Sequence, residues 1–157
     1  MPKIDIAKAP VRKGSLYPAP YNEQPAARLR QALGDAAGLD DFGVNILTLP
    51  PGAWSSQRHW HNKEDEFIYM LSGELTLITD AGEEILRPGD CAAFAKNVPD
   101  GHHLVNKSNA PAACLEIGSR RRDDFTVYPD IDLLFDDKAG WYTRKDGTPY
   151  PKPDSIK

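Results

Sequence analysis

The chain has 157 residues, which fits one domain and is too short for two ordinary domains with separate cores. Hydrophobic residues make up 40% of it, enough to form a core, and its 12 glycines and 14 prolines indicate many turns in place of long helices. The net charge of −4, without a basic stripe, argues against a nucleic-acid partner. No apolar run approaches the roughly 18 residues of a membrane span, and the first residues lack a secretory signal, so we expect a cytoplasmic protein without membrane contact.

Both ends of the chain are rich in proline. Nine of the 14 prolines lie in residues 1–25 or 129–157, so we expect extended, irregular ends without regular strand pairing and without a second core. Residues 24–34 have a helix-like composition between Pro25 and Gly34, but the segment is short and equally compatible with an edge strand.

Short segments rich in β-branched and apolar residues fill the middle of the chain. Each is typical of a strand, and glycine, proline, asparagine and aspartate at the joints predict turns. The predicted strands are residues 43–49, 53–60, 66–71, 74–79, 83–87, 91–95, 102–106 and 112–117. Strands at this spacing predict an all-β fold, either a small antiparallel barrel or a sandwich.

A cluster of positive charge follows the last predicted strand. Arg120, Arg121 and Arg122 are consecutive, but Asp123 and Asp124 come directly after them. Because the two carboxylates should cancel most of the positive field, we interpret this segment as a solvated turn.

The four histidines form two close pairs, His59/His61 and His102/His103. Residues two apart on a strand point to the same face, so His59 and His61 should project side by side. Glu66 follows a polar, turn-like segment and can begin the next strand facing the same way. Two imidazoles and a carboxylate suit a metal ion, although a surface pair beside acidic residues would give the same pattern.

The second pair can supply a third imidazole. His102 and His103 are adjacent, so only one of them can readily join the first pair. Three imidazoles and one carboxylate suit Zn, Fe, Mn, Ni or Cu, and in octahedral geometry they leave two positions open. Open positions favour catalysis over a purely structural role.

The spacing of these residues resembles the cupin superfamily. The first cupin motif contains a glycine, His-x-His, a glutamate and a second glycine, and it is matched by Gly52, His59, His61, Glu66 and Gly73, with a spacer after the first glycine that is one residue longer than usual.

The second cupin motif is matched less closely. Gly89 begins it, and His102 with Asn106 keeps its His-x3-Asn ending. Ala95 and Asn97 stand where the motif has proline and glycine, and two extra residues precede His102. Asparagine tolerates the left-handed conformation that glycine would supply, so the turn can survive.

The resemblance covers residues 43–118 and implies the cupin fold, a small antiparallel jelly-roll barrel. We therefore divide the chain into an N-terminal extension (1–42), a cupin barrel (43–118) and a C-terminal extension (119–157) that packs on the barrel. Residues 128–132 and 145–150 also resemble a subgroup of small bacterial cupins, some of them described as sugar-phosphate isomerases.

Carried over residue by residue, the cupin pattern implies one divalent ion (Zn, Fe, Mn or Ni) bound by His59, His61, Glu66 and His102. Strand alternation then sends His103 to the opposite face, unless the two extra residues shift the register. Gln57 shares the inward parity of the histidines and could bind a substrate oxygen, although a wall position bonded to backbone is also open.

The resemblance implies a mononuclear-metal enzyme that acts on a polar small molecule, a sugar phosphate or an organic acid, by isomerase or dioxygenase chemistry. The alternative is a cupin that binds or senses a small molecule without turnover. Phe67, Tyr69 and Leu71 should form an outward apolar row on their strand, which favours a homodimer.

Overall fold

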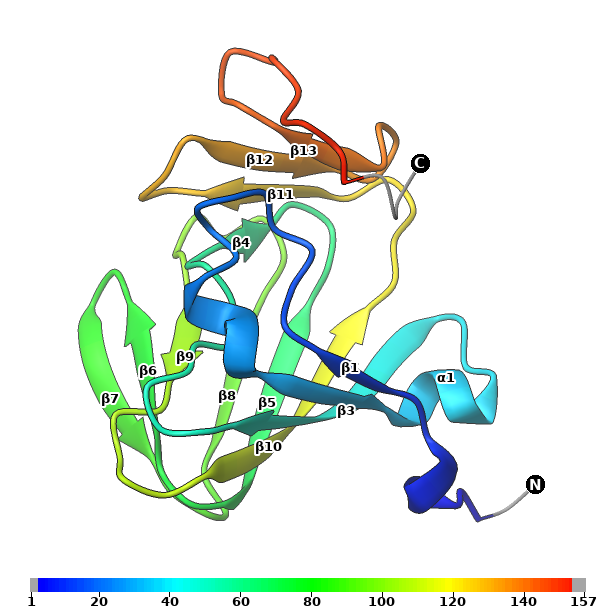
Figure 1. Cartoon of the computed structure of the whole chain (residues 1–157), viewed down its shortest axis with the longest axis vertical. Coiled ribbons are helices and arrows are strands. Elements are labelled where there is room, and N and C mark those ends of the chain that lie inside the picture. Colours follow the sequence, from blue (N-terminus) through cyan, green and yellow to red (C-terminus); the bar gives the residue numbers. More distant parts are fainter. Residues whose placement is uncertain (1–2, 154–157) are drawn as a thin grey trace.

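The computed structural model describes residues 3–153, and strands make up most of its regular structure (Figure 1). The strands are β1 (Val11–Lys13), β2 (Leu29–Ala32), β3 (Phe42–Leu49), β4 (Trp60–His61), β5 (Glu66–Ser72), β6 (Leu75–Thr79), β7 (Gly82–Leu86), β8 (Cys91–Phe94), β9 (His103–Val105), β10 (Ala112–Ser119), β11 (Phe125–Tyr128), β12 (Leu133–Asp136) and β13 (Trp141–Thr143). The helical elements are single turns or little more: η1 (Ile6–Lys8), η2 (Gln24–Ala27) and α1 (Leu33–Ala37). In residues 3–153 no helix has the length and apolar character needed to cross a membrane.

All strand pairs are antiparallel and form three sheets. The six-stranded sheet has the order β1-β2-β3-β10-β5-β8, the four-stranded sheet β13-β12-β11-β4, and the three-stranded sheet β7-β6-β9. Consecutive strands pair in several places, and strands distant in sequence also pair, as β3 does with β10 over its whole length. This is the predicted all-β jelly-roll architecture. The strand pairs of the described residues do not close into one continuous barrel.

The main core lies between the six-stranded and three-stranded sheets. Leu47 of β3, Met70 of β5, Leu75 of β6 and Cys114 of β10 are almost fully buried in it. Along β5 the buried residues alternate with an exposed row, formed by Phe67, Tyr69 and Leu71, as the sequence predicts.

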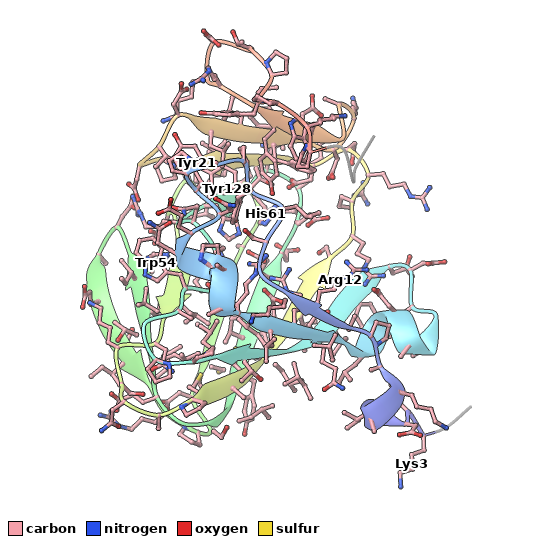
Figure 2. All side chains as sticks on the ribbon, viewed as in Figure 1. Lys3, Arg12, Tyr21, Trp54, His61 and Tyr128 are labelled. Atoms are coloured by element: carbon pink, nitrogen blue, oxygen red, sulfur yellow. The ribbon has the colours of Figure 1, made fainter. Side chains whose placement is uncertain are left out.

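A second, aromatic cluster lies beneath the four-stranded sheet, where Figure 2 places Tyr21 and Tyr128. Its buried members are Tyr17, Tyr128, Leu133 and Tyr150, so both ends of the chain contribute. The expectation of irregular ends without a second core is therefore wrong. The prolines lie at the borders of these segments, and residues 130–148 contain none, which leaves β12 and β13 free to form ladders.

Two further expectations need correction. Residues 53–60 form no continuous strand: Trp54 makes an isolated bridge to Val105, and β4 begins only at Trp60. The polar residues between them form hydrogen bonds to other segments of the same chain instead. The Ser55 hydroxyl, for example, accepts the N–H of Leu104. Residues 24–34 divide into η2, β2 and the start of α1. Part of the segment is therefore a strand, but it pairs on both sides, with β1 and β3, and is not at the edge of the sheet.

Candidate metal centre

Backbone pairing brings the two histidine groups together. His59 and His102 form an antiparallel bridge, in which each N–H donates to the other residue's carbonyl at 3.2 and 2.9 Å. The two imidazole rings are 4.9 Å apart between centroids. His61 follows on β4, and Glu66 begins β5 after the intervening turn. Two strands and one isolated bridge therefore bring four candidate ligands to one place.

The donor atoms converge on a single carboxylate oxygen. The Nε2 atoms of His59 and His61 each lie 3.5 Å from Glu66 Oε2, and the Nε2 atom of His102 lies 2.8 Å from it. Donors held at about 2.1 Å from a metal ion are spaced about 2.9–3.4 Å from their neighbours, from the geometry of octahedral and tetrahedral sites. The ligand atoms of His59, His61 and Glu66 all lie within 4.8 Å of one another, so these three residues fit a divalent metal ion. His102 adjoins this group through its contact with Glu66.

The other ring nitrogens of the first pair are held by acceptors. His59 Nδ1 donates to the carbonyl oxygen of Gln57 at 2.9 Å, and His61 Nδ1 donates to Asp124 Oδ2 at 2.6 Å. A proton on Nδ1 leaves the Nε2 lone pair free and fixes the ring, which is the usual support of a metal-bound histidine. Both rings are therefore oriented for ligation.

His102 is held differently. Its Nδ1 atom is buried and has no hydrogen-bond partner among residues 3–153. Phe94 stacks on the imidazole ring with a centroid distance of 3.5 Å and parallel planes. The ring is therefore oriented by this stacking and by the hydrogen bond that Nε2 donates to Glu66 Oε2 at 2.8 Å.

His103 points away from the cluster. Its ring packs edge-on against Trp54 at 4.7 Å, and Nδ1 lies 3.1 Å from the carbonyl oxygen of Ser56. His103 is buried, so its surroundings are the protein interior.

The turn of the second cupin motif is formed as expected, because Asn97 adopts a left-handed φ of 60° in place of glycine.

The structure does not bring Gln57 to the histidine cluster. Its buried side-chain amide donates to the carbonyl oxygen of Tyr21 at 2.8 Å and to Gln24 Oε1 at 3.0 Å. These bonds tie the histidine segment to the N-terminal part of the chain. Gln57 therefore matches the alternative expected from the sequence, a polar residue of the barrel wall that is bonded to backbone.

Sequence reasoning missed several residues around the cluster. Asp124 was interpreted as part of a solvated turn, yet it is buried and holds His61. Glu64 is partly buried, with Oε2 3.8 Å from His61 Nδ1. Tyr128 of β11 stacks on His59 with the ring centroids 5.8 Å apart. The pairing of β11 with β4 brings Asp124 and Tyr128 into place, and sequence spacing does not reveal this pairing.

The ionisation of the cluster follows from burial and charge. Burial lowers the pKa of His59, which favours the neutral imidazole. Burial also acts against the charged form of His61, but the hydrogen bond to Asp124 and the nearby carboxylates outweigh it and raise the pKa to about 9. Glu66 is opposed by burial too, yet its bonds to the histidines hold its pKa well below the usual range.

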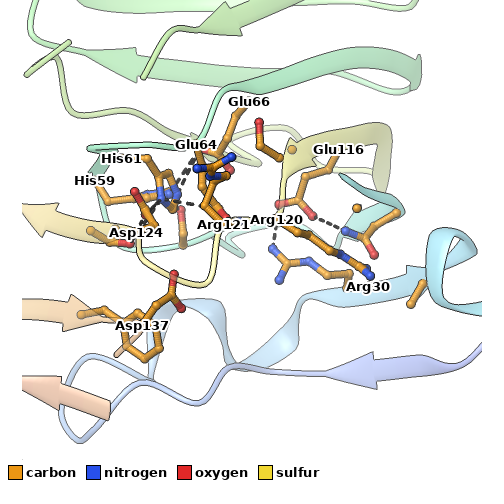
Figure 3. A pocket seen from close by; sticks show the side chains of 18 of the residues that line it. Arg30, His59, His61, Glu64, Glu66, Glu116, Arg120, Arg121, Asp124 and Asp137 are labelled. Atoms are coloured by element: carbon orange, nitrogen blue, oxygen red, sulfur yellow. Dashed lines mark hydrogen bonds and ion pairs between the residues drawn. The ribbon is translucent and has the colours of Figure 1, made fainter. Parts of the chain in front are cut away.

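A cavity of about 630 Å³ opens onto His59, His61 and Glu66. Figure 3 shows the histidine cluster on one side of it and Arg30 with Glu116 on the other. Arg30 Nη2 donates to Glu116 Oε1 at 2.7 Å, while its Nε atom has no partner among residues 3–153. A cavity of this size holds a small polar molecule beside the metal ligands.

Comparisons with known proteins agree with this architecture. A family model for the cupin domain matches residues 45–118. The crystal structure of a sugar phosphate isomerase from a cupin superfamily, from Silicibacter pomeroyi DSS-3, is 44% identical and has a TM-score of 0.90, with 96% of this chain and 97% of the other covered. A structure from Acidithiobacillus ferrooxidans ATCC 23270, proposed to be a sugar phosphate isomerase, is 31% identical with a TM-score of 0.70 and 75% of each chain covered.

A curated protein matches over a shorter region. Endoribonuclease YbeY of Myxococcus xanthus (strain DK1622) is 29% identical over 105 residues, which are 66% of this chain and 32% of that protein. The chain thus spans about a third of the length of that relative. The match supports a shared segment and carries no conclusion about nuclease activity.

Proposed function

Since the chain belongs to the cupin superfamily, we propose that it is a mononuclear-metal enzyme that isomerises a sugar phosphate. The ligands of the divalent ion would be His59, His61, Glu66 and His102. The observation that carries the proposal is the convergence of three imidazole Nε2 atoms on Glu66 Oε2. His59, His61 and Glu66 also line a cavity large enough for a small polar molecule.

A bound divalent ion would act as a Lewis acid that polarises a carbonyl oxygen. The residues of the chain would supply the rest. Isomerisation needs a group that removes a proton from the carbon beside the carbonyl and returns it to the neighbouring carbon. Glu64 and Glu116 are carboxylates of the cavity wall outside the ligand set, and they are the candidates for this transfer.

The similarity to the Silicibacter pomeroyi structure supports the substrate class, because it extends over 96% of this chain and includes both ends that line the cavity. Tyr17 and Arg30 come from the N-terminal extension, and Tyr142 comes from the C-terminal one. The proposed substrate site therefore depends on all three parts of the chain.

The test is a turnover assay on untagged protein loaded with Mn, Fe, Ni or Zn. Aldose and ketose phosphates are incubated with it in deuterated water, and NMR follows interconversion and deuterium uptake at the carbon beside the carbonyl. Turnover by the wild type and its loss in His61→Ala would support the proposal. Ligand binding without turnover or exchange under every metal would favour the binding-and-sensing alternative instead.

We also propose that the chain works as a cytoplasmic homodimer. Phe67, Tyr69 and Leu71 are 37%, 42% and 41% exposed on the outer face of the six-stranded sheet. An apolar row on a sheet face is stabilised when a second copy covers it, and a two-fold axis would place β5 against β5.

The proposed cytoplasmic location is supported by the cysteines. Cys91 and Cys114 are free thiols, consistent with a reducing compartment.

A further inference from the structure

The arginine segment between β10 and β11 forms part of the wall of the metal cavity. Arg120, Arg121 and Arg122 all line the cavity that contains His59 and His61. Figure 3 shows Arg120 and Arg121 between the histidine cluster and the Arg30–Glu116 pair. The segment is therefore in contact with the space that a substrate would occupy.

The two acidic residues that should neutralise the segment are bound to other groups as well. Asp124 turns inward and accepts hydrogen bonds from His61 Nδ1 and the N–H of Lys63. Asp123 pairs with the Lys63 ammonium and lies 3.7 Å from Arg121 Nε, beyond hydrogen-bond distance. The expected exposed turn is present, but its charge is not cancelled as expected, because Asp124 is buried and Asp123 is shared with Lys63.

The three arginines have different roles. Arg120 is structural, because its guanidinium donates to the carbonyl oxygen of Leu39 and to Asp35. Gly43 leaves the space for it, since a Cβ there would lie 3.3 Å from Arg120 Nε. Arg121 and Arg122 are exposed, and no side-chain hydrogen bond of either is found within residues 3–153. They are the cations available to a ligand.

Arg121 is anchored close to the metal ligands. Its backbone N–H donates to Glu64 Oε1, and the other oxygen of that carboxylate lies 3.8 Å from His61 Nδ1. One side chain thus connects the backbone of Arg121 to a ligand residue. The position of the arginine relative to the metal centre is fixed even though its side chain is exposed.

Arg121 also borders a second cavity of about 490 Å³ on the outer side of the segment. The other charged residues of that cavity are Lys63 and Lys96, and Lys96 has no ion pair among residues 3–153. Arg121 therefore lines both the metal cavity and a second cavity whose charged residues are all cationic. A guanidinium can bind phosphate through two parallel hydrogen bonds, a geometry that a lysine cannot provide.

We propose that Arg121 is the specificity residue that binds the phosphate group of a phosphate-monoester substrate while the other end of that substrate lies at the metal centre. Arg122, which lines the same cavity, adds the second positive charge that a phosphate dianion requires. This inference rests on the proposed function for the presence of a substrate at the metal centre, and it adds the residue that selects phosphate esters over neutral sugars.

The experiment measures ligand binding by calorimetry on metal-loaded wild type, Arg121→Gln, Arg121→Lys and Arg87→Gln. The probes are glucose 6-phosphate, ribose 5-phosphate, inorganic phosphate and the two parent sugars. Arg87 is the matched control, because it is an exposed arginine paired with Glu74 and outside the cavity. Metal content is measured on every variant, so that a loss of binding is not a loss of the ion.

We expect Arg121→Gln to weaken phosphate-ester binding about 10-fold to 100-fold, as for the loss of a charged hydrogen-bond pair. Arg121→Lys should be intermediate, and Arg87→Gln should bind as the wild type does. Phosphate-ester binding by Arg121→Gln within twofold of the wild type overturns the inference, as does an equal loss in Arg87→Gln or a wild type that binds neither phosphate ester nor inorganic phosphate. Binding that depends on Arg121 without any turnover contradicts the isomerase proposal and supports the inference.

Discussion

His61 donates its Nδ1 proton to Asp124 at 2.6 Å, which joins the histidine cluster to the segment that follows β10. Asp124 is buried and also accepts the N–H of Lys63, so two hydrogen bonds hold its carboxylate at the start of the turn between β4 and β5. One carboxylate therefore orients a candidate ligand and positions the arginine segment at the mouth of the cavity.

Replacing Asp124 should weaken metal binding without removing a ligand. In Asp124→Asn the amide can still accept a bond from His61 but carries no charge, and we expect metal affinity to fall about 10-fold to 100-fold. Competition with a chelator measures the change. Asp123→Asn is the matched control, since Asp123 is partly exposed and contacts only the exposed cations of Lys63 and Arg121. Equal affinities of Asp124→Asn and the wild type would show that the carboxylate does not support the site.

The two adjacent histidines should respond differently to removal. His102→Ala loses an imidazole that faces Glu66, so metal occupancy should fall by about 10-fold or more, because even supporting groups are worth 10-fold to 100-fold. His103→Ala should retain the metal and lower the melting temperature, because the ring packs on Trp54 in the interior. Metal retained in His102→Ala and lost in His103→Ala would contradict the proposed ligand set.

Metal affinity should rise with pH up to about 9. The pKa of His61 in the metal-free protein is raised to about 9, so below that pH a bound metal must displace its proton. Each pH unit below this pKa should then lower the metal affinity by up to about tenfold, because binding displaces one proton. Titrations with zinc at several pH values, together with proton release in weakly buffered solution, test this. An affinity that is constant between pH 6 and 8 would contradict it.

The metal-free protein should show the opposite trend in stability with pH. The raised pKa of His61 contributes stability that is complete below its unfolded value of about 6.5 and is lost as the pH rises through about 9. The lowered pKa of Glu66 contributes stability above about 4.5 that is lost in acid. Melting curves of the metal-free protein should therefore give the highest melting temperature between about pH 4.5 and 6.5. A maximum at or above pH 9 would be inconsistent with a protonated His61.

The exposed row on β5 should control the oligomeric state. Tyr69→Glu places a charge at the centre of this row, so we expect the proposed dimer to dissociate in sedimentation velocity measurements. Ile85→Glu is the matched control, because Ile85 is 46% exposed on β7, in another sheet. A wild type that is monomeric at high concentration would disprove the dimer.

The strands in the middle of the chain could be predicted because alternation is a local property of the sequence. Their predicted bounds agree with β3 and β5 to within one residue at each end. The segment 53–60 failed because its serines and glutamine satisfy hydrogen bonds to distant parts of the chain, and composition does not reveal those partners.

The site could be predicted only as far as its residues are close in sequence. His59, His61 and Glu66 follow one another along two strands, so spacing alone indicated a shared face. Asp124 is 63 residues from His61, and it reaches the site because β11 pairs with β4. The proline count gave a wrong expectation for the C-terminal end, because residues 130–148, which contain β12 and β13, have no proline.

The most direct test of the metal centre is X-ray absorption spectroscopy on the zinc-loaded, untagged protein. We expect scattering from three imidazoles at about 2.0–2.1 Å with at least one oxygen at about 2.0–2.2 Å, and two imidazoles in His102→Ala. Fewer than three imidazoles in the wild type, or an imidazole number that His102→Ala leaves unchanged, would contradict the assignment of His59, His61, Glu66 and His102.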